Sequence, residues 1–318
     1  MTSGLLVVSI FVGSGVALWL VSLIVEAMRP IPATPTTLGW APEIPIRYIK
    51  VGNCRLRYIN TGAGPSLVLL HTLRTQLDLF EKVVPELAKH FTVYALDYPG
   101  HGYSDIPKAP YDAEFFVRSV EGFLEALDLR GVTLCGVSIG ASISLNIAGR
   151  RNSRVARVIA INSYDYYKGH GLARSSFLGR LSVTLSDIPV VGETFTRLRN
   201  FVVVKAILEG GVVNPTAIPI ELLREMYSVG NRPGHYRAFL SLLRNSETWE
   251  KASKIYANIN VPALLIWGDQ DWSTPRERDD DRRLVPGTQT ATVQNGGHFL
   301  PLDCPREVQD LIIGFASG

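Results

Sequence analysis

The feature that most constrains the fold is an alternation of apolar, β-branched runs with amphipathic stretches from about residue 46 onward. Several runs are almost continuously apolar, which is typical of parallel strands covered on both faces. Strands that alternate with helices form βαβ units with right-handed crossovers. The sequence therefore predicts an α/β fold with a mostly parallel, eight-stranded sheet and helices on both faces. The expected strands are residues 46–51, 54–60, 66–71, 91–97, 132–138, 157–163, 263–269 and 290–295, and the expected helices 77–90, 112–127, 139–151, 275–283 and 305–315.

The alternation is interrupted between residues 166 and 255, a stretch too long for an irregular loop within a compact domain. Its patterns are helical, and prolines punctuate it. We interpret residues 166–255 as a helical cap inserted into a core that comprises residues 46–165 and 256–318.

The first 25 residues contain no charged side chain, and residues 5–25 consist of 16 hydrophobic residues with only Gly and Ser between them. A helix of about 20 apolar residues spans the hydrocarbon core of a bilayer. The sequence thus predicts a single-pass membrane anchor over residues 1–28, with the lipid bilayer as a partner. A cleavable signal peptide is an alternative, although a basic N-terminal region and a clear cleavage site are missing. A buried core helix is another, but such a helix normally shows a polar face.

The segment after this helix bears on orientation. Arg29, Arg47 and Lys50 follow the apolar run, and the positive-inside rule then favours a cytoplasmic body. Residues 29–45 contain five prolines, which favour an extended and stiff linker.

Composition excludes several classes of protein. The three cysteines are far apart in the sequence, so neither a disulfide framework nor a Cys-x-x-Cys metal site is expected. The histidines lack the His-Glu-x-x-His spacing of a zinc enzyme, and we expect no metal and no cofactor. A net charge of +3 over 318 residues is too small to indicate nucleic-acid binding.

Ser138 stands in the pentapeptide Gly-Val-Ser-Ile-Gly, between an apolar run and a stretch compatible with a helix. Gly-x-Ser-x-Gly alone is a weak signal, but a strand, a tight turn and a helix are the context that a nucleophile elbow requires. The alternative is a plain turn with a serine cap. We predict that Ser138 is a nucleophile.

A serine hydroxyl needs a base, and the base needs a carboxylate that orients it. His298 follows the last expected strand, and Asp271 follows the strand before it. The carboxyl ends of strands are where open α/β sheets place their sites. Asp269 is the competing acid, although it is better placed to close the turn. The predicted catalytic set is Ser138, Asp271 and His298.

From about residue 46 to 318 the chain resembles the α/β-hydrolase superfamily. The resemblance rests on four segments in order: LLHTLRTQ (69–76), DYPGHGYSD (97–105), LCGVSIGA (134–141), and GDQDWSTP (268–275) with GGHFLPLDCP (296–305). It implies an oxyanion hole made by the backbone N–H groups of Leu73 and Ile139, and a structural role for His101. The chain departs from the family where His-Thr replaces the usual His-Gly before Leu73.

The resemblance also bears on the reaction. Haloalkane dehalogenases and epoxide hydrolases of this fold use an aspartate nucleophile, whereas a serine indicates acyl transfer. The prediction is a serine hydrolase that cleaves a small-molecule, hydrophobic acyl ester through an acyl-enzyme. A C–C bond hydrolase, a cofactor-free haloperoxidase-like enzyme and a non-catalytic scaffold of the same fold remain alternatives.

Two polar residues near the expected pocket have no assigned role. Arg74 is either a contact for an acidic group of the substrate or a paired or solvent-facing arginine. Gln76 lies in the same loop, and its role stays open, as do the acyl and alcohol groups of the substrate and the oligomeric state.

Overall fold

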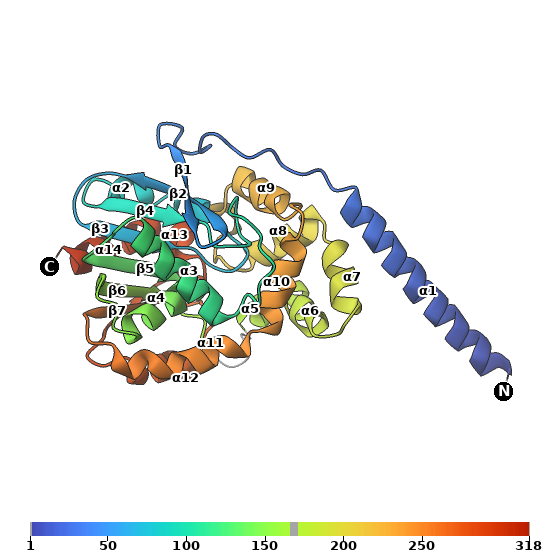
Figure 1. The fold of residues 1–318 in the computed structure, drawn as a ribbon. Coiled ribbons are helices and arrows are strands. Elements are labelled where there is room, and N and C mark those ends of the chain that lie inside the picture. Colours follow the sequence, from blue (N-terminus) through green and yellow to red (C-terminus); the bar gives the residue numbers. More distant parts are fainter. Residues whose placement is uncertain (1, 166–170, 318) are drawn as a thin grey trace.

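A computed structural model describes residues 2–165 and 171–317 of the chain (Figure 1). Its centre is an eight-stranded sheet with the order β1-β2-β4-β3-β5-β6-β7-β8. The first two strands pair antiparallel with their neighbours, and all later pairs are parallel. The α/β-hydrolase-type sheet predicted from the sequence is confirmed. The strands are β1 (Ile46–Val51), β2 (Cys54–Thr61), β3 (Ser66–Leu70), β4 (Thr92–Leu96), β5 (Val132–Val137), β6 (Val155–Ile161), β7 (Ala263–Gly268) and β8 (Gln289–Val293).

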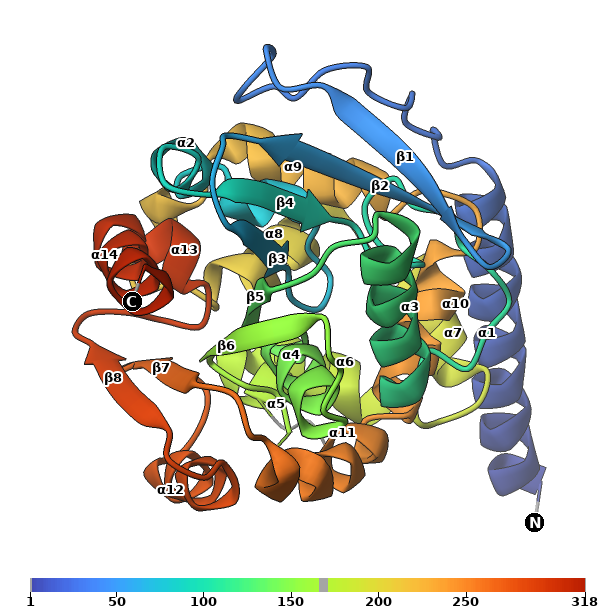
Figure 2. The same ribbon diagram turned by 60° about the vertical axis from the view of Figure 1, so that its left-hand side comes forward.

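The sheet is covered on both faces because most residues of its central strands are apolar and buried. In β3, Leu67 and Leu69 belong to one buried cluster, whereas Val68 and Leu70 belong to another. Alternate residues of a strand point to opposite faces, so the sheet needs helices on both sides. One face is packed by α2 (Val84–Leu87) and α14 (Pro305–Ala316), and the other by α3 (Ala113–Ala126), α4 (Ile139–Gly149) and the end of α12 (Pro275–Leu284), as Figure 2 also shows.

The helix expected over residues 77–90 is interrupted. The chain instead forms the 3-10 turn η1 (Leu77–Phe80) and the short α2. Pro85 lies at the start of α2, where a missing N–H does no harm. A proline inside a longer helix would remove one backbone hydrogen bond and clash with the preceding turn.

A helical insertion, residues 171–258, joins β6 to β7 and lies beside the carboxyl ends of the strands (Figure 1). The predicted cap begins at residue 166, and residues 166–170 lie outside the described residues; the boundaries of linker, core and cap stay predictions. The elements of the insertion are α5 (Gly171–Ser175), α6 (Phe177–Ser186), α7 (Val191–Arg197), α8 (Phe201–Glu209), η3 (Pro215–Ala217), α9 (Ile220–Val229), α10 (His235–Arg244), α11 (Glu247–Ala252) and η4 (Ser253–Asn258).

The N-terminal helix α1 (Thr2–Ala27) corrects one prediction. Across residues 2–165 and 171–317, the structure contains no helix that combines the length and the apolarity needed to cross a membrane. The prediction of a single-pass anchor over residues 1–28 is therefore wrong. The cytoplasmic orientation of the body was derived from that anchor and is no longer supported. The carboxyl-terminal end of α1 instead contacts α7 of the insertion (Figure 2), with Ser22 buried and Glu26 partly buried there. The bilayer partner was inferred from the anchor and loses its basis.

Candidate active site

Ser138 lies in the turn between β5 and α4 with φ 57° and ψ −117°, a backbone conformation that residues other than glycine rarely adopt. The turn is tight because its two glycines touch neighbouring backbone. A Cβ on Gly136 would lie 2.0 Å from the carbonyl carbon of Gly140, and one on Gly140 would lie 2.2 Å from the carbonyl oxygen of Leu70. The turn places Ser138, which is buried, at the amino end of α4, where the helix dipole favours negative charge.

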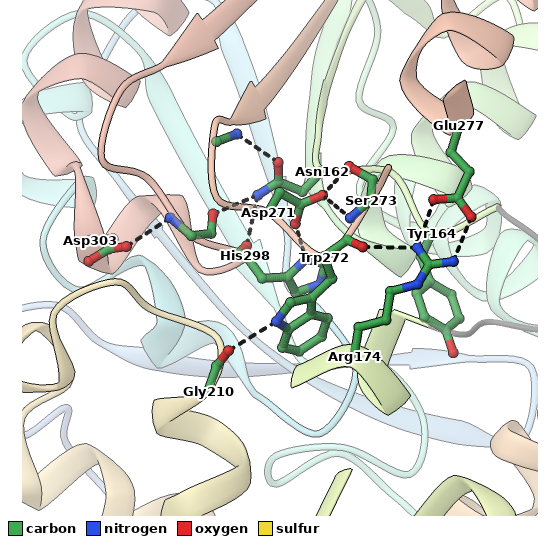
Figure 3. A network of polar contacts seen from close by, with 12 residues as sticks. Asn162, Tyr164, Arg174, Gly210, Asp271, Trp272, Ser273, Glu277, His298 and Asp303 are labelled. Carbon is green, nitrogen blue, oxygen red and sulfur yellow. Dashed lines mark hydrogen bonds and ion pairs between the residues drawn. The ribbon is translucent and has the colours of Figure 1, made fainter. Parts of the chain in front are cut away.

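His298 and Asp271 form a buried pair at the ends of β8 and β7 (Figure 3). Nδ1 of His298 lies 2.5 Å from Oδ1 of Asp271, and both side chains are almost fully buried. The other carboxylate oxygen accepts hydrogen bonds from the backbone N–H, at 2.9 Å, and the hydroxyl of Ser273. Burial alone would raise the pKa of Asp271. The attraction of His298 and the hydrogen bonds from His298 and Ser273 outweigh burial, so the pKa lies below its usual value.

Asn162, just after β6, joins the two loops that carry this pair. Its side-chain amide donates to the carbonyl oxygens of Gly297 and His298, both at 3.0 Å, and its Oδ1 accepts from the N–H of Gly268 at 3.0 Å (Figure 3). Sequence reasoning missed Asn162. The available signal was an Asn at the carboxyl end of a strand, a residue type that tolerates the positive φ of 49° found here.

Trp272 is the second residue that sequence reasoning missed. Its indole stacks on the His298 imidazole with 3.8 Å between ring centroids and 11° between planes. Its Nε1 donates to the carbonyl oxygen of Gly210 in the insertion at 3.0 Å (Figure 3). The ring orientation of His298 is thus fixed by Asp271 at one edge and by Trp272 on one face.

Two buried polar atoms of the site have no hydrogen-bond partner among the described residues: Oγ of Ser138 and Nε2 of His298. A neutral imidazole that donates its Nδ1 proton to Asp271 has its lone pair on Nε2. The atom that could accept a proton and the hydroxyl that could lose one are therefore both uncommitted.

The two backbone N–H groups expected to form an oxyanion hole belong to Leu73 and Ile139. Within the described part of the chain, neither donates a hydrogen bond. Ile139 is the first residue of α4, so its N–H has no acceptor inside the helix. Thr72, where the family usually has glycine, is not among the residues with positive φ; Arg74, two positions later, has φ 63°.

A cavity of about 280 Å³ opens beside Ser138, between the sheet and the insertion. Most of its lining is aliphatic or aromatic, and Trp272 connects it to His298. The lining residues are Thr72, Leu73, Arg74, Ser138, Tyr164, Leu172, Ser182, Phe195, Thr196, Leu198, Arg199, Asn200, Val203, Val204, Ile207, Leu208, Phe239, Trp272 and Phe299.

Other polar residues singled out in the sequence are occupied elsewhere. Asp269 accepts a hydrogen bond from the N–H of Gly296 at 3.2 Å, and so closes a turn. Gln76 is buried and donates to Asp78 at 2.7 Å. Burial lowers the pKa of His101 to about 3, which leaves it neutral and packed among aromatic rings. In the described residues, no group of three or more His, Cys, Asp or Glu could hold a metal ion.

Comparison with known proteins gives the following relationships. A family model described as "alpha/beta hydrolase fold" matches residues 65–305. The chain is 26% identical over 262 residues to 2-(acetamidomethylene)succinate hydrolase of Mesorhizobium japonicum, covering 80% of this chain and 88% of that protein. It is 26% identical over 279 residues to haloalkane dehalogenase 2 of Mycobacterium bovis, covering 84% of this chain and 93% of that protein. The crystal structure of Cfl2 from Burkholderia cenocepacia superposes with a TM-score of 0.77 at 23% identity, covering 88% of this chain and 98% of that one.

Proposed function

The chain belongs to the alpha/beta hydrolase fold family, and from this premise we propose that it is a serine hydrolase of small-molecule esters. The observation that carries the proposal is the set of uncommitted atoms at the carboxyl ends of the strands. These atoms are Oγ of Ser138 and Nε2 of His298, the latter on an imidazole held by Asp271.

The proposed reaction proceeds through an acyl-enzyme. Oγ of Ser138 attacks the ester carbonyl while Nε2 of His298 takes the hydroxyl proton, and the N–H groups of Leu73 and Ile139 hold the resulting oxyanion. His298 then gives its proton to the leaving alcohol as the C–O bond breaks. Water, deprotonated by His298, attacks the acyl carbonyl, and Ser138 leaves with that proton as the carboxylic acid forms. Asp271 orients His298 and stabilises its charged form.

The identity of the nucleophile separates this chemistry from dehalogenation. Displacement of a halide by a carboxylate gives an ester, which water can cleave, but displacement by Ser138 would give an ether, which water does not cleave. Acylation of Ser138 gives an ester and permits turnover. We therefore do not extend to this chain the activity named for the relative haloalkane dehalogenase 2.

The apolar lining of the cavity supports a hydrophobic acyl or alcohol group in the substrate. Each Å² of apolar surface that is buried on binding contributes about 25 cal/mol. The helical insertion supplies much of this lining, including Val203, Ile207 and Phe239. We propose that it acts as the cap that selects the substrate.

Labelling with a fluorophosphonate tests the proposal together with hydrolysis of p-nitrophenyl esters of increasing acyl length. We expect Ser138→Ala to abolish labelling and to lower kcat by about a million-fold, because nothing else can form the acyl-enzyme. Ser144→Ala is the matched control: Ser144 lies on α4, but its hydroxyl is bonded to the Gly140 carbonyl, and this variant should still be labelled. Folded protein that neither reacts with the probe nor cleaves any ester would contradict the proposal.

A further inference from the structure

The charge of the cavity is one-sided. Among its lining residues only Arg74 and Arg199 are charged, and none is a carboxylate. Buried cations are normally paired, because an isolated charge loses most of its hydration energy on burial. Arg199 is buried and Arg74 is partly buried, so two guanidinium groups in a mostly apolar cavity call for an explanation.

Arg74 has no carboxylate partner. It follows Leu73 in the loop after β3, and its guanidinium lies 4.7 Å from the ring centroid of Phe239 on α10. Among the residues that the structure describes, no oxygen accepts a hydrogen bond from it and no acid pairs with it. Its backbone also adopts the unfavourable φ of 63°, so the surrounding structure holds the side chain in this place against a local cost.

Arg199 is only partly satisfied. It is 6% exposed, and its Nη atoms donate to both carboxylate oxygens of Glu26, at 2.7 and 3.4 Å, and to the carbonyl oxygens of Thr196 and Gly230, at 3.0 and 2.5 Å. Its Nε is buried without a hydrogen-bond partner. A Cβ built on Gly230 would lie 3.4 Å from Nη2 of Arg74 and 3.7 Å from Nε of Arg199, so both guanidinium groups approach Gly230, beside the carbonyl oxygen of Tyr227 at 3.0 Å from the same Cβ.

The nearby negative charge does not balance these cations. Glu26 pairs with Arg199 and also with Arg29, at 3.1 Å. One carboxylate thus faces three guanidinium groups. Burial, followed by the like charges of Arg199 and Arg29, lowers the pKa of Arg74 to about 9, while Glu26 acts in the opposite direction. Arg74 remains charged at neutral pH, and an anion beside it would remove the imbalance.

We propose that Arg74 and Arg199 form a binding site for an anionic group of the substrate, so that the ester carries a carboxylate or a phosphate in addition to its reacting carbonyl. A guanidinium group binds either anion through paired hydrogen bonds. Arg74 directly follows Leu73, whose N–H is proposed to hold the oxyanion, and both residues line the cavity beside Ser138. The apolar lining accommodates the hydrocarbon part of the substrate. The assignment rests on the proposed ester hydrolysis.

The kinetic test compares three sets of esters of matched length: neutral p-nitrophenyl alkanoates, p-nitrophenyl half-esters of dicarboxylic acids, and acyloxyalkyl phosphates. Wild type should prefer one anionic set, which also identifies the anion. Arg74→Met should lower kcat/KM for that set by about 10- to 100-fold, mostly through KM, and leave the neutral esters nearly unchanged. Arg74→Lys should retain part of the preference. Arg224→Met is the matched control, because Arg224 is exposed on α9 and away from the cavity.

Two results would overturn the assignment: no preference of wild type for either anionic set, or an equal loss on neutral and anionic esters in Arg74→Met. The second pattern would show that Arg74 only supports the cap.

A binding measurement separates this assignment from the proposed function. Calorimetry of Ser138→Ala with a non-hydrolysable keto-carboxylate and a keto-phosphate, against a neutral ketone of the same length, needs no catalysis. Tighter binding of an anionic ketone that disappears in Ser138→Ala/Arg74→Met supports the site even if no ester is cleaved. Equal binding of the charged and neutral ketones rejects the site even if ester hydrolysis is established.

Discussion

At the scale of single residues, Asp271 shows how the candidate site resolves opposing forces. Burial disfavours its charge, but three interactions favour it, one with the His298 ring and two hydrogen bonds from Ser273, and together they depress its pKa. The carboxylate is therefore charged throughout the neutral range, as a group that orients a base must be.

Replacement of Asp271 by Asn should lower kcat by about 1,000- to 10,000-fold, because an amide can present its N–H to Nδ1 and thereby stabilise the wrong tautomer of His298. Asp269→Asn is the control, since Asn retains the oxygen that accepts from Gly296. Steady-state kinetics on one ester decides the matter; a larger loss in Asp269→Asn would transfer the orienting role to Asp269.

The same substitution has a consequence for stability. The folded pKa of Asp271 is depressed, so its contribution is present above the unfolded value of about 3.9 and is lost as the pH falls through the folded pKa. Denaturant unfolding between pH 5 and 2 should show this acid-dependent loss in wild type and a smaller one in Asp271→Asn. If the free energy of unfolding falls equally with pH in both proteins, the pairing of Asp271 with His298 is contradicted.

At the scale of elements, α12 is attached to the end of β6 through a buried acidic pair. Asp281 of α12 accepts a hydrogen bond from Ser163, and Asp165 lies beside it. Burial is the main cause that raises the pKa of both carboxyl groups, and the charge of Asp165 raises the pKa of Asp281 further, so Asp281 retains its proton well above the usual range of an aspartate.

This pair predicts a stability profile of opposite sign to that of Asp271. A raised folded pKa contributes stability that is full below the unfolded value of about 3.9 and is lost as the pH rises through the folded pKa. Asp281→Asn should remove this loss, so the free energy of unfolding of the variant should gain on wild type by up to about 1.4 kcal/mol per pH unit above pH 4. Denaturant unfolding from pH 4 to 8 measures it. Asp280→Asn is the control, because Asp280 is exposed. If the free energies of unfolding of Asp281→Asn and wild type differ by the same amount at every pH, the raised pKa of Asp281 is refuted.

The elements were more predictable from the sequence than their contacts. All eight strands were expected within a few residues of their observed bounds, because strand ends coincide with a change from apolar to polar residues.

The order Ser138, Asp271, His298 could be read along the chain, since each follows a strand. Asn162 and Trp272 were missed, because their contacts depend on loops that meet only after folding. The apolar composition of α1 suggested a membrane anchor because composition does not show the ion pairs at the end of that helix.

At the scale of the whole molecule, Arg29 connects the N-terminal segment to the helical insertion. It donates to the carbonyl oxygens of Arg197 and Arg199, at 2.6 and 2.5 Å, and to Tyr227 and Asn231. The carbonyl groups at the end of α7 lack partners within their own helix, so a cation there both satisfies them and interacts well with the helix dipole.

Arg29→Met should therefore destabilise the protein by about 1.5–3 kcal/mol, the range for hydrogen bonds to a charged group, and lower Tm by a few degrees. Differential scanning calorimetry of Arg29→Met beside the exposed Arg224→Met is the measurement. If the two variants unfold at the same temperature, the contact of Arg29 with the insertion contributes nothing to stability.

The place of the insertion between β6 and β7 also affects synthesis of the chain. β6 pairs with β5 on one side as soon as both have left the ribosome, but its other edge waits for β7, which is roughly 100 residues further along. At about 5–20 residues per second, that edge stays open for about 5–20 s. An open edge of an apolar strand can pair with another chain, so the nascent protein passes through an interval of exposure to aggregation that ends only when β7 is complete.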